Sequence, residues 1–291
     1  MNLITIFHRY PDQRACIEHL ERVRWKGEPF CPHCACIDVA PKCDGHRVGR
    51  WNCHACKSSF NVLSGTIFEK TKVPLQKWFL AIGLMVNAKK SLSSYQLARD
   101  LDLTQPTALY LQHRIRAAMN VDHALLQGIV EADETYVGGK PRKRNRRDDD
   151  TPAPRGRGTR KTPVIGVVER GGQVRAEVAH DLTGTGIVRF LKKHVDPEGT
   201  LLISDDYKGY SPVRKVMNHA VINHQVSYAE GMIHTNTIEG FWSLLKRAWM
   251  GSHHKYSVKM MPLFVAEQEW KWNHRGEDVD SFGDFLEGCF A

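Results

Sequence analysis

Apolar residues recur at helical intervals through the first part of the chain. The pattern covers residues 1–28, returns at Pro74 and then covers residues 93–119. Pro74 suits the first turn of a helix, where its missing N–H costs nothing. Residues 29–62, between the first two helical segments, are rich in cysteine and punctuated by Pro and Gly. We therefore expect helices on both sides of a small, irregular segment.

From Gly128 onward the spacing changes to short runs that are typical of β-strands. The runs are GIVEADETYVGG, TPVIGVVER, QVRAEVAH and TLLISDD. A helix over Ile187 to His194 is expected between the last two runs, and residues 234–275 return to helical spacing. The order strand, strand, strand, helix, strand predicts an α/β domain.

A basic segment, residues 140–162, separates the first two predicted strands. It is rich in Arg, Lys, Pro and Gly and has almost no apolar residues. We interpret it as an insertion rather than a linker, because the strands on either side belong to one sheet. It is either a solvated hairpin or a basic arm that follows the DNA backbone. In the second interpretation its DNA contacts include Arg142, Lys143 and Arg144.

The bulk composition is that of a globular protein, with 42% hydrophobic and 25% charged residues among 291. No stretch approaches the roughly 20 apolar residues that span a bilayer, and the first residues lack a secretory signal pattern. The net charge of +9 and the pI of about 9.1 favour polyanions such as DNA. We expect a cytoplasmic, nucleoid-associated protein without a membrane partner.

Six of the eight cysteines crowd between Cys31 and Cys56, which favours metal binding over disulfides. Two CxxC pairs stand 18 residues apart in this segment, a spacing that can place four thiolates around a structural zinc ion. The predicted ligands are Cys31, Cys34, Cys53 and Cys56. Some neighbouring residues are surplus and could substitute for a ligand, namely Cys36, Cys43, His33 and His54. Zinc ribbons bind DNA, RNA or protein, so the ribbon alone does not specify a function.

Residues 93–119 have the layout of a helix-turn-helix. Ser94 is expected to cap the first helix, and Thr104 the second, with Pro106 in its first turn. The expected buried side of the second helix is Ala108, Leu111, Ile115 and Ala118. The other side would read DNA. It comprises Thr107, Gln112, His113, Arg114 and Arg116. Two packed helices with a charged face also occur in proteins that never bind DNA.

Carboxylates occur where strands and a helix could bring them together. Asp133 lies within the first predicted strand, Asp205 and Asp206 end the fourth, and Glu239 opens a helical stretch. Such oxygens suit Mg²⁺ or Mn²⁺. Lys246 follows Glu239 by about two helical turns and shares its face, which Asn236 also borders. The plainer interpretation of each residue is a surface acid, a cap or a solvated ion pair, and spacing alone does not decide between them.

Several long motifs resemble one known family. They are GTIFEKTKVPLQKWFLAI, EADETYVGGK, SDDYKGY and HTNTIEGFWSLLKR, in that order. The chain resembles bacterial insertion-sequence transposases that carry an N-terminal zinc ribbon before a DDE integrase-type catalytic domain (the ISXO-type, Merlin-related group). The resemblance extends from RWKGEPFCPHC to KWNHR. It implies a ribonuclease H-like catalytic fold, with a mixed sheet and flanking helices.

The resemblance also implies roles for individual residues. Asp133 matches the first carboxylate and Asp205 the second, with Asp206 as the reserve. Family members differ over whether Asn or Glu supplies the third ligand, and both are present here as Asn236 and Glu239. We favour Glu239, because an anionic oxygen binds Mg²⁺ better than an amide does. Lys246 matches the trailing basic residue. The roles of His253 and His254 in GSHHKYS are undefined.

These inferences predict a transposase that binds the terminal inverted repeats of its element. It would hydrolyse phosphodiester bonds to expose 3′ hydroxyls and join them to target DNA by two-metal chemistry. Two ends require two active sites, so a homodimer or higher oligomer on double-stranded DNA is expected. The alternative is a non-catalytic zinc-ribbon DNA-binding regulator derived from a transposase. The expected domains are 1–68 (helix and ribbon), 69–124 (helix-turn-helix) and 125–291 (catalytic). The acidic tail GEDVDSFGDFLEGCFA has no predicted role.

Overall fold

The computed structural model describes residues 1–42, 48–120, 124–139, 159, 161–222, 234–254, 257–276 and 280–290. The chain divides into two compact units. The first comprises Met1–Val121 together with Gly276–Ala291, and the second comprises Asp122–Arg275. Within the described part of the chain, no helix has the length and apolar character needed to cross a membrane.

The first unit begins with two helices, where the sequence predicted continuous helical character over residues 1–28. α1 spans Leu3–Arg9 and α2 spans Gln13–Trp25. The break falls at Tyr10 and Pro11, and Asp12 then caps α2 by accepting a hydrogen bond from the Ala15 N–H at 2.8 Å. A small antiparallel sheet follows, formed in the described residues by β1 (Val39–Pro41), β2 (Arg50–Cys53) and β3 (Ser59–Asn61).

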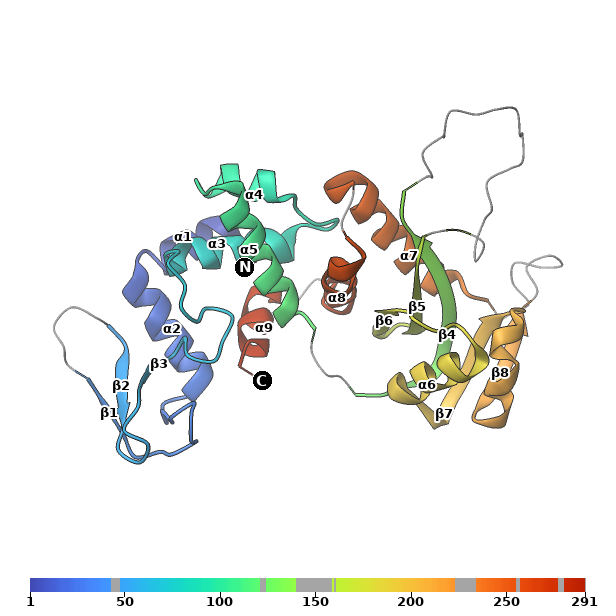
Figure 1. Ribbon diagram of the computed structural model, residues 1–291, viewed down its shortest axis with the longest axis horizontal. Coiled ribbons are helices and arrows are strands. Elements are labelled where there is room, and N and C mark those ends of the chain that lie inside the picture. The colour runs from blue at the N-terminus through green and yellow to red at the C-terminus, as the bar shows by residue number, and fades with distance from the viewer. Residues whose placement is uncertain are drawn as a thin grey trace. The chain divides into compact units, whose positions relative to one another are not determined.

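The helical part of this unit contains α3, α4 and α5 (Figure 1). They span Leu75–Asn87, Ser94–Asp100 and Gln105–Ala118. The cap of α4 is Ser93, whose hydroxyl accepts from the Gln96 N–H at 3.2 Å, so the prediction of Ser94 was wrong by one residue. The Ser94 hydroxyl instead accepts a hydrogen bond from Gln105 Nε2 at 2.8 Å, which ties α4 to the first residue of α5.

The acidic C-terminal segment forms part of the first unit, whereas we expected it in the catalytic domain. It contains α9 (Ser281–Gly288), which packs against α2 and α3. Phe282, Phe285 and Leu286 are almost fully buried, and the Phe282 ring lies 5.6 Å from that of Phe79. The segment that had no predicted role therefore completes a hydrophobic core, which its three apolar residues at helical spacing explain.

The second unit is built on a mixed sheet (Figure 1). Its strands are β4 (Leu126–Val137), β5 (Thr162–Glu169), β6 (Val174–Val178), β7 (Val195–Asp205) and β8 (Asn218–Ile222). Among the described residues the strand order is β6-β5-β4-β7-β8. β4, β5 and β6 are antiparallel neighbours, while β7 and β8 continue from β4 in parallel. This order confirms the predicted ribonuclease H-like class. The sequence did not predict β8.

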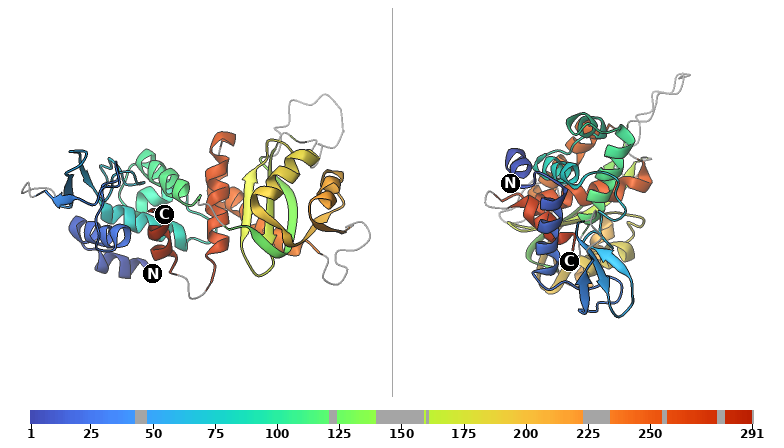
Figure 2. Two further views of the ribbon diagram at one scale, coloured as in Figure 1. Left: turned by 90° about the horizontal axis from the view of Figure 1, so that it is seen from below. Right: turned by 90° about the vertical axis from the view of Figure 1, so that its left-hand side faces the viewer.

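Helices cover both faces of this sheet (Figures 1 and 2). One face carries α6 (Gly184–His194) and the 3₁₀ helix η2 (Lys208–Lys215), and the other carries α7 (Asn236–Ala248) and α8 (Met261–Asn273). Short helical turns, η3 (Trp249–His253) and η4 (Val258–Met260), connect α7 with α8. Side chains alternate along β4, so Val130 and Ala132 join the first core while Val137 joins the second.

The outer edge of β6 is covered by α8. The outward N–H of Val174 donates to Asn273 Oδ1 at 2.8 Å, and that of Ala176 donates to Glu269 Oε2 at 2.9 Å. Burial raises the pKa of Glu269 to about 7. These side chains satisfy backbone groups that would otherwise be free to pair with another strand. α8 therefore fixes the end of the sheet opposite to β8.

Candidate active site and metal centre

The predicted zinc ligands lie together in the first unit. The Sγ atoms of Cys31 and Cys56 are 3.7 Å apart, and those of Cys34 and Cys53 are 3.6 Å apart. A tetrahedral site with Zn–S bonds of about 2.3 Å has S–S edges of about 3.8 Å, so the four thiols fit zinc without rearrangement. In the described residues this is the only group of three or more Cys, His, Asp or Glu whose ligand atoms lie within 4.8 Å of one another.

The surplus residues near the ribbon have other contacts. The Cys36 sulfur accepts a hydrogen bond from the Asp38 N–H at 3.4 Å, and His54 Nδ1 lies 3.0 Å from Asp38 Oδ1. Cys43 lies outside the described residues. Hydrogen bonds from Ser58 stabilise the thiolate of Cys56 and lower its pKa to about 6, which favours the form that binds metal.

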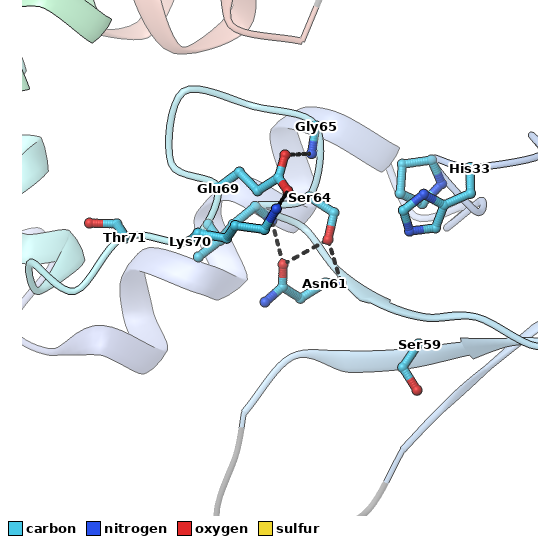
Figure 3. A pocket seen from close by; sticks show the side chains of 10 residues that line it. His33, Ser59, Asn61, Ser64, Gly65, Glu69, Lys70 and Thr71 are labelled. Carbon is cyan, nitrogen blue, oxygen red and sulfur yellow. Dashed lines mark hydrogen bonds and ion pairs between the residues drawn. The ribbon is translucent and has the colours of Figure 1, made fainter.

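A cavity of about 630 Å³ opens beside the ribbon (Figure 3). Its polar groups largely bond with one another. Ser64 Oγ donates to Asn61 Oδ1 at 3.2 Å, and the Gly65 N–H donates to Glu69 Oε2 at 3.2 Å. His33 also lines the cavity. All of these residues belong to the first unit, whereas the predicted catalytic carboxylates belong to the second.

The structure corrects the predicted DNA-reading face of α5. Gln112 and Arg116 are 1% and 0% exposed, and Gln112 Nε2 donates to the Leu92 carbonyl at 2.9 Å. Buried side chains of α5 lie on one broad helical stripe, which is wide enough to include both. Its members are Ala108, Leu111, Gln112, Ile115 and Arg116. The prediction that Gln112 and Arg116 face DNA was therefore wrong, and the spacing from Ala108 could have revealed it.

Other residues predicted to bind DNA have mixed outcomes. Arg114 is engaged within the unit: it donates to the Thr66 carbonyl at 3.0 Å and also bonds the Tyr110 hydroxyl. Thr107 is half-buried, and its hydroxyl pairs with that of Thr104 at 2.8 Å. The remaining residues lie outside the described part, namely Arg142, Lys143 and Arg144.

Two of the predicted carboxylates are neighbours on the sheet. Ala132 of β4 pairs with Ser204 of β7 in parallel register, which sets the next residues, Asp133 and Asp205, side by side. Both extend toward the face that α7 covers, because side chains alternate along each strand. Asp205 Oδ1 accepts a hydrogen bond from the Tyr207 N–H at 3.1 Å. Asp206 is exposed just beyond the end of β7.

The pKa of Asp133 is raised to about 7. Burial is the main cause, and the negative charges of Glu134 and Asp205 add to it. A cation between Asp133 and Asp205 would relieve the repulsion between the two carboxylates. The donor set of hard oxygens fits Mg²⁺ or Mn²⁺.

α7 reaches this pair through Trp242. Its indole Nε1 donates to Asp133 Oδ2 at 2.9 Å. Gly166, opposite Asp133 on β5, makes room for the indole, because a Cβ there would lie 2.6 Å from a Trp242 ring atom. Glu239 lies one turn before Trp242, is exposed, and accepts a hydrogen bond from the Thr235 hydroxyl at 3.5 Å. The structure therefore sets Asp133 beside Asp205 and bonds α7 to Asp133, but the carboxylate oxygens of Asp133, Asp205 and Glu239 do not all lie within 4.8 Å of one another.

The other predicted residues of the third motif also lie on or after α7. Asn236 is its first residue and Lys246 lies in its last turn, and both side chains are exposed. The His253 ring packs against Phe264 of α8, with the ring centres 4.7 Å apart. His254 follows with a positive φ of 54° at the end of η3.

Sequence reasoning missed the acids that flank Asp133. Glu134 points to the opposite face, where the buried Tyr210 hydroxyl donates to its Oε2 at 3.4 Å. Burial and the nearby carboxylates raise the pKa of Tyr210 well above its usual value, so the hydroxyl remains a donor. Glu131 is 0% exposed and contacts the start of α7. The sequence signal that could have identified Glu131 and Glu134 was the presence of a charged residue inside an otherwise apolar strand.

Comparison with known families identifies two matching domains. The model of the ISXO2-like transposase domain matches residues 125–273, and that of the transposase zinc-ribbon domain matches residues 11–59. A relative from Halobacterium salinarum, named as an uncharacterized protein in transposable element ISH50, is 29% identical over 254 residues. The match covers 84% of this chain and 85% of the relative.

Solved structures of the Mos1 transposase are weakly similar. One is its paired-end complex with the left transposon end, with a TM-score of 0.30, 11% identity, and coverage of 73% of this chain and 75% of that one. Another is the Mos1 strand transfer complex, with a TM-score of 0.29, 12% identity, and coverage of 72% and 73%. Such low similarity adds nothing to the fold assignment, which depends on the sheet order and the family match.

Proposed function

The chain belongs to the ISXO2-like transposase family, and we propose that it cleaves DNA at the ends of a mobile element and joins them to target DNA. In this proposal Asp133, Asp205 and Glu239 hold divalent cations. The observation that carries it is the side-by-side placement of Asp133 and Asp205, with α7 bonded to Asp133 through Trp242.

Each residue has a defined part in this proposal. Trp242 holds Oδ2 of Asp133 by a hydrogen bond, and the other carboxylate oxygen, Oδ1, would bind a cation. The Tyr207 N–H fixes one oxygen of Asp205 in the same way. Glu239, on the exposed side of α7, completes the oxygen set, and Asn236 is the alternative third ligand. Divalent cations bound there would activate the attacking oxygen and stabilise the leaving one.

The chemistry proceeds by two in-line displacements at phosphorus. Water first attacks a phosphodiester at the element's end and leaves a free 3′ hydroxyl. That hydroxyl then attacks a target phosphate and displaces a 3′ hydroxyl of the target strand, so one phosphodiester bond replaces another and the enzyme forms no covalent intermediate. Lys246 shares a helical face with Glu239 and would neutralise charge on the phosphate. Joining two ends requires two such sites, which we expect from a dimer or higher oligomer.

DNA recognition is assigned to the first unit. It contains the zinc-ribbon match and the paired helices α4 and α5. The net charge of +9 favours binding to a phosphate backbone. Since Gln112 and Arg116 are buried, base contacts from α5 would come from its exposed residues, of which Tyr110 is 47% exposed.

The decisive experiment compares the wild-type chain with Asp133→Ala on DNA that contains the element's ends. We expect Mg²⁺-dependent cleavage by the wild type, a loss of at least about a thousandfold in the variant, and unchanged end binding. Glu198→Ala is the control, because Glu198 is an exposed acid at the far end of β7. End binding without cleavage by the wild type would instead identify a regulator. Preferential cleavage of RNA would identify an RNA-processing nuclease.

A further inference from the structure

A buried carboxylate joins β4 to the first turn of α7. Glu131 is 0% exposed, and its Oε2 accepts hydrogen bonds from the backbone N–H groups of Thr237 at 2.8 Å and Ile238 at 3.0 Å. Its Oε1 accepts from the Thr237 hydroxyl at 2.9 Å and from Arg170 Nε at 2.7 Å. His234 Nδ1 lies 3.2 Å from the same oxygen.

Glu131 thereby caps a helix to which it does not belong. The N-cap residue of α7 is Thr235, and its side chain makes no capping hydrogen bond to the helix. The first backbone N–H groups of α7 therefore need another acceptor. A carboxylate at a helix N-terminus also interacts favourably with the helix dipole. Arg170 neutralises the carboxylate and donates to the His234 carbonyl at 2.9 Å, which fixes the residues that lead into the helix.

Glu131 and Asp133 form two separate hydrogen-bonded contacts between β4 and α7. Glu131 and Asp133 lie two residues apart on β4, which is about 6.7 Å. Their partners on α7, Ile238 and Trp242, lie four residues apart, which is about 6 Å of helix. The spacing of the two contacts along β4 therefore matches their spacing along α7. In the sequence, Glu239 lies between Ile238 and Trp242. Sliding of α7 along β4 would break the hydrogen bonds at both contacts.

We propose that Glu131 is a positioning residue that sets the register of α7 on β4 and so places Glu239 beside the Asp133–Asp205 pair. This inference rests on the proposed metal-dependent function. Glu131 is not itself a ligand, because both of its oxygens are occupied by donors from the protein and the side chain is fully buried. It acts through the position of Glu239 and Trp242.

The test compares Glu131→Gln with Glu131→Asp. Glutamine preserves size but turns an amide toward the helix N–H groups, while aspartate preserves the charge and shortens the side chain. Mn²⁺ binding to each full-length chain is titrated by electron paramagnetic resonance, with Asp133→Ala as the background. We expect both variants to bind Mn²⁺ about 10- to 100-fold more weakly, as for other residues that orient metal ligands. The Mg²⁺ concentration for half-maximal cleavage should rise in parallel, with end binding unchanged.

The outcomes separate geometry from charge and from simple folding defects. If Glu131→Asp binds Mn²⁺ as the wild type does, the residue acts only through its charge, and the proposal is overturned. Unchanged Mn²⁺ affinity in a folded Glu131→Gln chain also overturns it.

If neither variant folds, Thr237→Val provides the test, because it removes one hydrogen-bond donor to Glu131 and leaves the carboxylate in place. We expect this variant to bind Mn²⁺ about threefold more weakly, and an unchanged affinity refutes the proposal. A wild type that binds Mn²⁺ at this site but does not cut DNA would refute the proposed function alone.

Discussion

The indole N–H of Trp242 donates to Oδ2 of Asp133 across 2.9 Å, and this bond links α7 to the centre of the sheet. It requires Gly166 on β5, where any side chain would collide with the indole. The bond stabilises the charged form of Asp133, and so it opposes the burial that raises the pKa of that carboxyl.

Replacement of Trp242 by Phe should therefore impair the site without removing the ring from the core. We expect Mg²⁺-dependent cleavage to fall about 10- to 100-fold, because a group that orients a metal ligand is lost. The pKa of Asp133 should rise further, which shifts the pH profile of cleavage to higher pH. Single-turnover cleavage rates measured across pH 5–9 would test both effects.

Trp272→Phe is the matched control for this substitution. Trp272 packs against the same hydrophobic cluster, and in the described residues its Nε1 has no hydrogen-bond partner. If both variants lose activity equally, packing rather than the hydrogen bond to Asp133 is responsible.

The raised pKa of Asp133 predicts how metal binding depends on pH. Cations bind the deprotonated carboxyl, so Mn²⁺ affinity should fall about tenfold for each pH unit below about 7. Isothermal titration at a series of pH values would measure this. A flat affinity between pH 5.5 and 8 would contradict the prediction, and Asp133→Asn should abolish the pH dependence along with most of the binding.

The raised pKa of Asp133 also predicts how folding stability without metal depends on pH. Metal affinity should rise with pH, whereas the stability of the folded chain should fall. Asp133 has a higher pKa in the folded chain, about 7, than the ordinary 3.8 expected after unfolding. The folded state therefore holds the proton more tightly, and the stability that this provides is complete below about pH 4 and is lost as the pH rises through 7. Without metal, Asp133→Asn should be more stable than the wild type at pH 8 and close to it at pH 4. Denaturant unfolding at the two pH values would decide.

The sequence predicted the fold where local patterns are strong. Short β-type runs located β4 to β7, and two CxxC pairs located the ribbon, because both patterns are short-range. β8 was missed, since Asn218–Ile222 is brief and its pairing with β7 depends on the completed sheet. The C-terminal segment was placed in the wrong unit, because nothing local to Phe282 indicates that its partner is Phe79.

The candidate site was only partly predictable. Asp133 and Asp205 could be named from the family motifs, but their adjacency comes from the register of β4 and β7. Glu131 was overlooked because its role depends on the N–H groups of a helix that begins more than a hundred residues later. On α5, Gln112 and Arg116 were assigned to the surface by their polarity, although helical spacing places them on the buried stripe.

The cysteine cluster predicts one zinc ion per chain. Cys34→Ser should lose most of the bound zinc and lower the melting temperature of the first unit, because a structural site supplies folding energy directly. Cys36→Ser is the control: its sulfur lies in the same segment but outside the four-cysteine group. Zinc released from the purified chains can be quantified with a colorimetric chelator. Zinc loss from Cys36→Ser equal to that from Cys34→Ser would contradict the ligand set.

α9 should stabilise the first unit rather than the catalytic one. Phe282 is 1% exposed and contacts the rings of Tyr10 and Phe79, so Phe282→Ala should reduce the free energy of unfolding of this unit by about 3–5 kcal/mol. Glu287→Ala, at an exposed position of the same helix, should change it by less than about 0.5 kcal/mol.

Denaturant titrations can follow the first unit by zinc release and the second by Mn²⁺ binding. Because α9 packs on α2 and α3, Phe282→Ala should move the zinc-release transition to lower denaturant and leave the Mn²⁺ transition in place. The reverse result would place α9 in the catalytic unit, as the sequence alone suggested.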